Sequence, residues 1–242
     1  MIMEGPIIEF KNVTMAFRRL RRHYGLKATL LHPFELAKGL SEAAEFKALD
    51  DVSFSIRRGE RVGIVGHNGC GKTTTLSLIG GIYRRYRGMI TVRGRVAMML
   101  ALGAGFNSQL SGRDNIILNG VLQGKTKNEM KALMQDVIDF ADIGDFIDAP
   151  LYQYSSGMLA RIGFGVATAI KPEILLVDEV MAVGDADFKK KCETRIQSLL
   201  ASGTTLILVS HSPGDIRRYC QRVIRLDHGK VVYDGPLEGS GA

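Results

Sequence analysis

The stretch GHNGCGKTTT, Gly66 to Thr75, decides the fold that we expect for this chain. It lies between an apolar run, RVGIV, and a segment with helical spacing, LSLIGGIY. Glycines let the backbone of such a loop curl so that successive N–H groups point at phosphate oxygens, and the positive end of the following helix adds to the attraction. The order of strand, glycine-rich loop and helix therefore predicts an α/β core that binds a polyphosphate.

The side chains of this loop have separate expected roles. We expect Lys72 to reach the β- and γ-phosphates of a nucleotide and the Thr73 hydroxyl to ligate Mg²⁺. Because Cys70 lies close to the start of a helix, we expect the pKa of its thiol to be lowered, so that alkylation would block nucleotide binding. The nucleotide-binding residues predicted here are Gly66, His67, Asn68, Gly69, Cys70, Gly71, Lys72, Thr73 and Thr74.

Two further apolar runs end in groups that suit phosphate chemistry. ILLV is followed by Asp178 and Glu179, and TLILV is followed shortly by His211. Continuous apolar runs are typical of central parallel strands, whose carboxyl ends form the ligand-binding edge of a sheet. Asp178 suits the Mg²⁺ shell, Glu179 suits a catalytic role in polarising the attacking water, and His211 would reach the γ-phosphate as a second catalytic group.

A second anion site is predicted at YSSGM, Tyr154 to Met158, directly before the predicted helix LARIGFGVATAI. Small polar residues and glycine at a helix start favour anion binding. The segment from about 108 to 171 is expected to be helical and separates this site from the glycine-rich loop. One ligand could then not use both sites of one chain, which suggests a head-to-tail dimer in which YSSGM of one subunit closes on the nucleotide of the other.

The remaining pattern predicts two early strands and a closing hairpin. Residues 6–17 and 48–56 alternate between apolar and polar positions, and RVIRLDHGKVVYDG is typical of a hairpin that turns at His228 and Gly229. After the glycine-rich loop, Leu76, Ile79 and Tyr83 are expected on one side of a single helix. The inward residues expected in the two strands are Ile8, Phe10, Val13, Val52, Phe54 and Ile56, and the expected core-facing helical stripe is Met130, Leu133, Met134, Val137, Ile138 and Ala141.

These elements predict a single domain over residues 1–242 with an α/β P-loop NTPase fold. Residues 1–107 and 172–242 are expected to form the core, with a mostly parallel sheet, together with an N-terminal antiparallel β subdomain. Residues 108–171 are expected to form an inserted α-helical subdomain, and residues 18–45 an inserted loop with a short helix.

Composition excludes several classes of protein. The chain has 242 residues, 45% of them hydrophobic, and no apolar run approaches the roughly 18–20 residues needed to cross a bilayer. Its N-terminus lacks the order of a secretory signal, so we expect a cytosolic chain that meets the membrane through a partner. Its three cysteines form no zinc or disulfide pattern. The net charge of +7 includes the basic segment RRLRR at 18–22, which suits either contact with anionic lipid headgroups or a solvated surface. Because no aromatic residues are interleaved with the basic ones, nucleic acid is not expected as a partner.

The ordered motifs GHNGCGKT, YSSGM, ILLVDE, AVGDAD and LVSH resemble those of an ATP-binding cassette (ABC) ATPase subunit over nearly the whole chain. The resemblance implies ATP, with Mg²⁺, held between two copies of the chain: the glycine-rich loop of one copy faces Ser155, Ser156 and Gly157 of the other. It places Asp185 in the dimer-contact loop. It assigns adenine stacking to Phe17 or, because the insertion blurs the alignment, to Tyr24.

LALGAGFNSQLSGRDNIILNG, YSSGMLARIGFGVAT and DEVMAVGDADFKKKC are similar to the ATPase subunits of exporters for O-antigen, capsule and teichoic acid. This narrower resemblance implies an integral membrane permease subunit, a lipid-linked polysaccharide as cargo, and a location at the cytoplasmic face of the inner membrane. Ordinary cassettes carry a glutamine where Leu102 or Gly103 falls here, and the LALGAGF backbone is the expected substitute. The alternatives are a non-transport ABC ATPase of the translation or DNA-repair type and a module that binds ATP without turnover.

Overall fold

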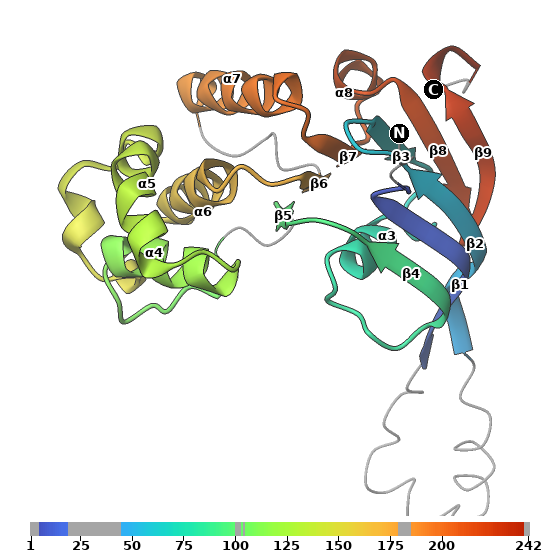
Figure 1. Ribbon diagram of the computed structural model, residues 1–242, viewed down its shortest axis with the longest axis horizontal. Helices are drawn as coiled ribbons and strands as arrows, with labels where there is room; N and C mark the ends of the chain where they lie inside the picture. Colours follow the sequence, from blue (N-terminus) through green and yellow to red (C-terminus); the bar gives the residue numbers. More distant parts are fainter. Residues whose placement is uncertain (1–4, 19–44, 100–102, 104, 179–184, 240–242) are drawn as a thin grey trace, which may run out of the picture.

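The computed structural model describes residues 5–18, 45–99, 103, 105–178 and 185–239 (Figure 1). The predicted insertion 18–45 therefore lies almost entirely outside the described residues, as do Tyr24 and Glu179. Within the described part, no helix is long and apolar enough to cross a membrane.

The N-terminal half contains a three-stranded antiparallel sheet in the order β2-β1-β4. Its strands are β1 (Ile8–Arg18), β2 (Glu45–Ile56) and β4 (Arg87–Val92). Alternate side chains of β1 and β2 point into one core, as the period of two requires. Phe10 and Phe54, which are paired across the two strands, stack with their ring centroids 4.5 Å apart. The six inward residues predicted for these strands are all buried.

A six-stranded sheet in the order β5-β6-β7-β3-β8-β9 forms the centre of the molecule. It is parallel except for the pair β8 and β9, which form the predicted hairpin around His228 and Gly229. The strands are β3 (Arg61–Val65), β5 (Val96–Met98), β6 (Ile174–Asp178), β7 (Thr205–Val209), β8 (Arg222–Asp227) and β9 (Lys230–Pro236). The short 3-10 helix η4 (Leu237–Gly239) follows β9. The strands predicted from continuous apolar runs are thus interior strands of the sheet.

Helices cover both faces of this sheet. Leu176 of β6 and Ile207 of β7 pack with α3 (Lys72–Ile79) and the small sheet in one core. Their neighbours Leu175 and Leu206 pack on the opposite face with α7 (Ala186–Ala201) and α8 (Pro213–Tyr219). The helix expected to include Tyr83 is shorter than predicted: it ends at Ile79 because two glycines follow, and Tyr83 packs against the first core from outside the helix.

The elements from Gly112 to Ala169 are all helical and lie to one side of the sheets (Figure 1). They are α4 (Gly112–Leu122), α5 (Lys127–Ala141), the 3-10 helices η1 (Gly144–Asp148) and η2 (Leu151–Gln153), and α6 (Ser156–Ala169). The predicted apolar stripe of α5 is confirmed: Met130, Val137 and Ala141 are fully buried, and the other three residues pack against the same core. A capping box between Thr126 and Glu129 starts α5.

Candidate nucleotide-binding site

A cavity of about 480 Å³ opens where the predicted loop meets the ends of the central strands. Most of the residues predicted to bind nucleotide or metal line this one cavity. The lining residues are Phe17, Phe46, Ala48, Asn68, Gly69, Gly71, Lys72, Thr73, Thr74, Asp178 and His211. The sheet therefore brings together residues from both ends of the chain, as the carboxyl edge of parallel strands should.

Glycines are required at the two ends of the loop. Gly66 has φ 146° and Gly71 has φ 111°, conformations that side chains disfavour. A Cβ atom at Gly71 would lie 2.5 Å from the carbonyl oxygen of Ala48. At Gly66 it would overlap the carbonyl oxygen of Leu226. The loop thus packs its backbone directly against β2 and β8.

Lys72 is the first residue of α3, and its ammonium group is folded back on the loop. It donates hydrogen bonds to the carbonyl oxygens of Gly66 (2.8 Å) and His67 (3.0 Å), and the side chain is almost fully buried. No side chain of the described residues caps this end of α3. Because the first N–H groups of a helix have no intrahelical acceptor, this end can bind an anion next to the lysine.

Thr73 and Asp178 meet at the floor of the cavity. The Thr73 hydroxyl donates to Oδ2 of Asp178 over 3.2 Å. In an octahedral Mg²⁺ site with ligands about 2.1 Å from the ion, adjacent oxygens lie about 3 Å apart. The pair is also made of the hard oxygen ligands that Mg²⁺ prefers. These residues therefore fit the ion that the sequence predicts here.

His211 lies just beyond β7 and lines the same cavity as Thr73 and Asp178. It is exposed, so its side chain is accessible to a ligand in that cavity. Glu179, the predicted catalytic carboxylate, follows Asp178 directly and lies outside the described residues. Its proposed role stays a prediction.

Two aromatic side chains form the rim at the end of the small sheet. Phe17 of β1 and Phe46 of β2 are paired across the strands, and both line the cavity. Phe17 also contacts Tyr83 edge to face, with centroids 5.4 Å apart. The family resemblance pointed to Phe17, whereas Phe46 and Ala48 were not predicted. Since Phe17 and Phe46 flank the insertion, their pairing becomes visible only if β1 and β2 are recognised as partners.

Three of the predicted loop residues do not line the cavity: Gly66, His67 and Cys70. Gly66 contributes through the backbone, while the His67 imidazole faces β8. The expectation for Cys70 is wrong. Its thiol is fully buried in the core beneath the loop, and burial raises its pKa above the ordinary value despite the nearby Lys72. Loss of solvation outweighs the positive end of the helix.

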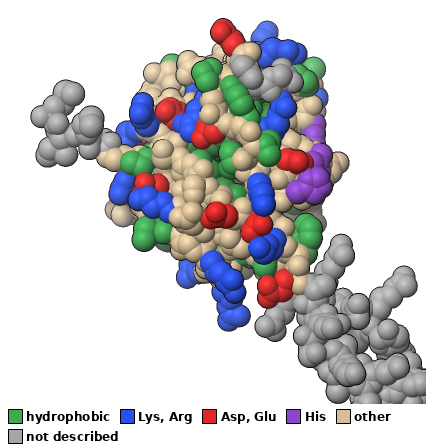
Figure 2. Space-filling view, turned by 90° about the vertical axis from the view of Figure 1, so that its right-hand side faces the viewer, with side chains coloured by type: hydrophobic (Ala, Val, Ile, Leu, Met, Phe, Trp, Pro, Cys, Tyr) green, Lys and Arg blue, Asp and Glu red, His purple; other side chains and the backbone are tan. Residues whose placement is uncertain are grey.

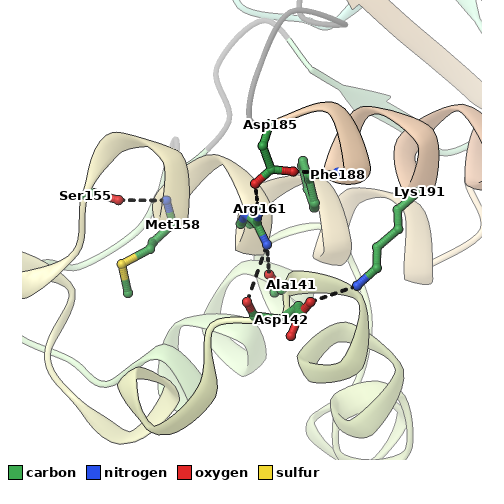
Figure 3. Close-up of polar contacts among 8 residues, drawn as sticks. All are labelled: Ala141, Asp142, Ser155, Met158, Arg161, Asp185, Phe188 and Lys191. Atoms are coloured by element: carbon green, nitrogen blue, oxygen red, sulfur yellow. Dashed lines mark hydrogen bonds and ion pairs between the residues drawn. The ribbon is translucent and has the colours of Figure 1, made fainter.

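The predicted signature residues begin α6, away from this cavity. Ser155 caps the helix, accepting a hydrogen bond from the N–H of Met158 over 3.2 Å (Figure 3). Ser155 and Ser156 are exposed, and a Cβ atom added to Gly157 would meet only the Ser155 hydroxyl. None of the three lines the cavity of its own chain. A ligand could therefore approach this helix end from outside the chain.

Asp185 caps α7 beside this helix. Its carboxylate accepts from the N–H of Phe188 (2.8 Å), which holds its pKa below the ordinary value, and Arg161 of α6 adds to the effect (Figure 3). Arg161 also donates to the carbonyl oxygen of Ala141 at the end of α5. Arg161 could not be predicted from the sequence, because an arginine within an apolar helix has no motif of its own.

Comparison with protein families matches residues 49–182 to the family described as ABC transporter. The O-antigen export system ATP-binding protein RfbB of Klebsiella pneumoniae is 41% identical over 238 residues, which cover 96% of this chain and 95% of that protein. The teichoic acids export ATP-binding protein TagH of Listeria innocua is 37% identical over 224 residues, 91% of this chain and 66% of that protein.

Among solved structures, a dimeric ATP-binding cassette in a post-hydrolysis state, bound to ADP and Pi, has the same fold. The TM-score is 0.72 at 21% sequence identity, and the match covers 96% of this chain and 99% of the other. At that identity the likeness concerns the fold. It confirms the predicted α/β architecture with an antiparallel N-terminal sheet and a helical region.

Proposed function

Since this chain belongs to the ABC transporter family, we propose that it is the ATP-hydrolysing subunit that powers export of a lipid-linked polysaccharide through a separate membrane subunit. The observation that carries the ATPase assignment is the contact between Thr73 and Asp178 in a cavity that also contains Lys72 and His211. The relatives named for O-antigen and teichoic acid export support the choice of cargo.

Each part of the cavity has a task in ATP hydrolysis. Lys72 leaves the carbonyl oxygens of its own loop and donates to the β- and γ-phosphates, while Phe17 and Phe46 hold the base at the rim. Thr73 and Asp178 would hold Mg²⁺, which when bound neutralises charge on the phosphate oxygens. Glu179 accepts a proton from the attacking water, and His211 donates a hydrogen bond to the γ-phosphate.

The chain works as an ATP-dependent homodimer. The α6 N-terminus is exposed and offers backbone N–H groups and small polar side chains, which suits contact with the γ-phosphate bound by a second copy. ATP then binds the closed pair better than the open one, and loss of the γ-phosphate lets the pair reopen.

The helical region transmits this movement to the membrane subunit. It carries exposed apolar side chains that suit a protein partner, among them Leu110, Val121, Leu122, Phe146 and Tyr152. Attachment to that subunit would hold the chain at the cytoplasmic face of the membrane. Co-purification with ribosomes or DNA, in place of a membrane protein, would favour the non-transport alternative.

Mixing two inactive variants tests the shared site. Lys72→Ala disables the loop, and Ser156→Arg blocks the α6 N-terminus. In a mixed dimer, one site contains both changes and the other contains neither, so we expect measurable ATPase activity to return on mixing. If each chain used its own Ser156, the mixture would stay as inactive as its components, which would contradict the dimer.

A cellular test addresses the cargo. In a strain that lacks the gene for this chain, the wild-type gene should restore surface polysaccharide, and Lys72→Ala should not, although both proteins are produced equally. Normal surface polysaccharide in the deletion strain would refute the assignment to export while leaving the ATPase assignment intact.

A further inference from the structure

The turn between β8 and β9 brings two histidines and an aspartate together beside the glycine-rich loop. His67 Nε2 lies 3.0 Å from Asp227 Oδ1, and His228 Nδ1 lies 2.9 Å from the same oxygen. The two imidazole rings have centroids 4.8 Å apart. Figure 2 shows histidine side chains gathered at one edge of the surface there. One ligand atom from each of the three residues lies within 4.8 Å of the others.

Backbone contacts fix these residues relative to one another. The N–H of Gly229 donates to the carbonyl oxygen of Cys70 over 3.1 Å, and the N–H of Asp50 donates to the carbonyl oxygen of Gly229 over 2.8 Å. His228 (φ 44°) and Gly229 (φ 77°) adopt the left-handed conformations of a tight hairpin turn. The turn that carries the cluster is therefore hydrogen-bonded to the glycine-rich loop and to β2. These contacts hold the three residues in place before an ion binds, so little conformational entropy is lost on binding.

The hydrogen bonding of His67 leaves a lone pair directed at a carboxylate. Its Nδ1 lies 2.8 Å from the carbonyl oxygen of Asn68, which can only accept, so Nδ1 carries the hydrogen. In the neutral imidazole, Nε2 then has a lone pair facing Asp227 Oδ1. Two acceptors 3.0 Å apart repel each other unless a cation lies between them or beside both.

We propose that His67, Asp227 and His228 bind a divalent transition-metal ion of the zinc class. Two imidazole nitrogens and a carboxylate are a ligand set that such ions prefer, whereas Mg²⁺ prefers oxygen ligands alone. All three side chains are substantially exposed, so an ion can enter from solution and keep water in its remaining position. The carboxylate offsets one of the two positive charges.

This metal site is separate from the nucleotide site. His67 does not line the nucleotide cavity; together with Asp227 it lines a second cavity, which shares only His211 with the first. A bound ion would join the loop to the β8–β9 turn. It would hold the backbone of His67, whose carbonyl oxygen accepts from Lys72, and leave Thr73 and Asp178 available.

Titration with Co²⁺ alone, followed by visible absorption, tests the site in the full chain without nucleotide. We expect saturation at one ion per chain, with the bands lost on adding Zn²⁺. Asp227→Asn and His228→Asn should each weaken binding at least tenfold, since even outer-shell partners of metal ligands carry roughly 10–100-fold effects. Asn tolerates the positive φ of residue 228, so the turn is kept.

His32→Asn is the matched control, because it removes a histidine other than the two that the proposal assigns to the ion. It should bind Co²⁺ as the wild type does. Absence of saturable binding by the wild type would overturn the proposal. Equal binding by wild type, Asp227→Asn and His228→Asn, or an equal loss in His32→Asn, would overturn the site. Circular dichroism of each variant shows whether it is folded.

Discussion

Arg161 and Asp185 form an ion pair, with 2.6 Å between Nη2 and Oδ2, that links α6 to the N-cap of α7 (Figure 3). The same guanidinium group lies 4.6 Å from the centroid of the Phe188 ring and donates to the end of α5 over 3.1 Å. One side chain thus joins three helices. It also connects the helix that begins at the predicted signature to the residue expected at the dimer contact.

Arg161→Ala should destabilise the protein. The change removes the ring contact and the donor to the carbonyl oxygen of Ala141, and we expect the free energy of unfolding to fall by about 1–3 kcal/mol. Urea unfolding measures it. Arg161→Lys should recover part of the loss, because lysine keeps the charge but lacks the planar fork. Lys191→Ala, which breaks an exposed pair with Asp142, is the control and should cost much less. Equal losses for the two alanine variants would contradict the special position of Arg161.

Lys72→Ala should weaken ATP binding. A charge-assisted hydrogen bond contributes about 1.5–3 kcal/mol, which corresponds to a loss of roughly tenfold to a hundredfold in affinity. Isothermal titration with a non-hydrolysable ATP analogue measures the dissociation constant. Lys189→Ala, on the exposed side of α7, is the matched control. If Lys72→Ala bound the ATP analogue with unchanged affinity, the assignment of the glycine-rich loop to the nucleotide site would be contradicted.

Phe17→Ala and Phe46→Ala should each weaken binding of ATP but not of inorganic triphosphate. Stacking of a base on an aromatic side chain contributes roughly 1–3 kcal/mol, and triphosphate has no base to stack. Competition against a fluorescent ATP analogue measures both ligands. Tyr24→Ala tests the alternative stacking residue. If only Tyr24→Ala lost ATP affinity, the base would stack on Tyr24 of the insertion and not on Phe17 or Phe46.

Stability should decrease in alkaline solution because of two buried thiols. Burial raises the pKa of Cys192 and of Cys220 to about 12, whereas an unfolded thiol titrates near pH 8.5. Because the pKa of each thiol is higher in the folded state, the protonated thiols contribute fully to the stability of the folded protein below about pH 8.5. This contribution to the free energy of unfolding is lost as the pH rises toward 12. Urea unfolding under reducing conditions at pH 8, 9 and 10 should therefore give a falling free energy.

The double variant Cys192→Ala, Cys220→Ala is the control for this pH effect. Its free energy of unfolding should fall less steeply with pH than that of the wild type. The difference between the two slopes should be up to about 1.4 kcal/mol per pH unit for each thiol removed. Parallel curves for wild type and variant would assign the alkaline loss to other groups.

The central sheet and its loop could be predicted because their signals are local. Apolar runs such as ILLV and TLILV identify interior strands, and the loop needs glycine where its backbone packs against Ala48 and Leu226. The position of Asp178 beside Thr73 then follows from the order of parallel strands.

The features that could not be predicted from the sequence depend on contacts between distant segments. Phe46 joins the site only through its pairing with Phe17, across the insertion. Arg161 acts through partners on two other helices. For Cys70, the helix end was visible in the sequence but burial was not, and burial has the larger effect on the thiol pKa. The end of α3 at Ile79 could have been predicted from the two glycines that follow.

The molar mass of Glu179→Gln with Mg²⁺ and ATP, measured by light scattering after size exclusion, tests the shared nucleotide site most directly. Removing the proton acceptor should leave ATP intact between two copies, so we predict a dimer with ATP and a monomer with ADP. Adding Ser156→Arg to the same variant should restore the monomer. A Glu179→Gln protein that stays monomeric with saturating ATP, even together with its membrane subunit, would contradict the account.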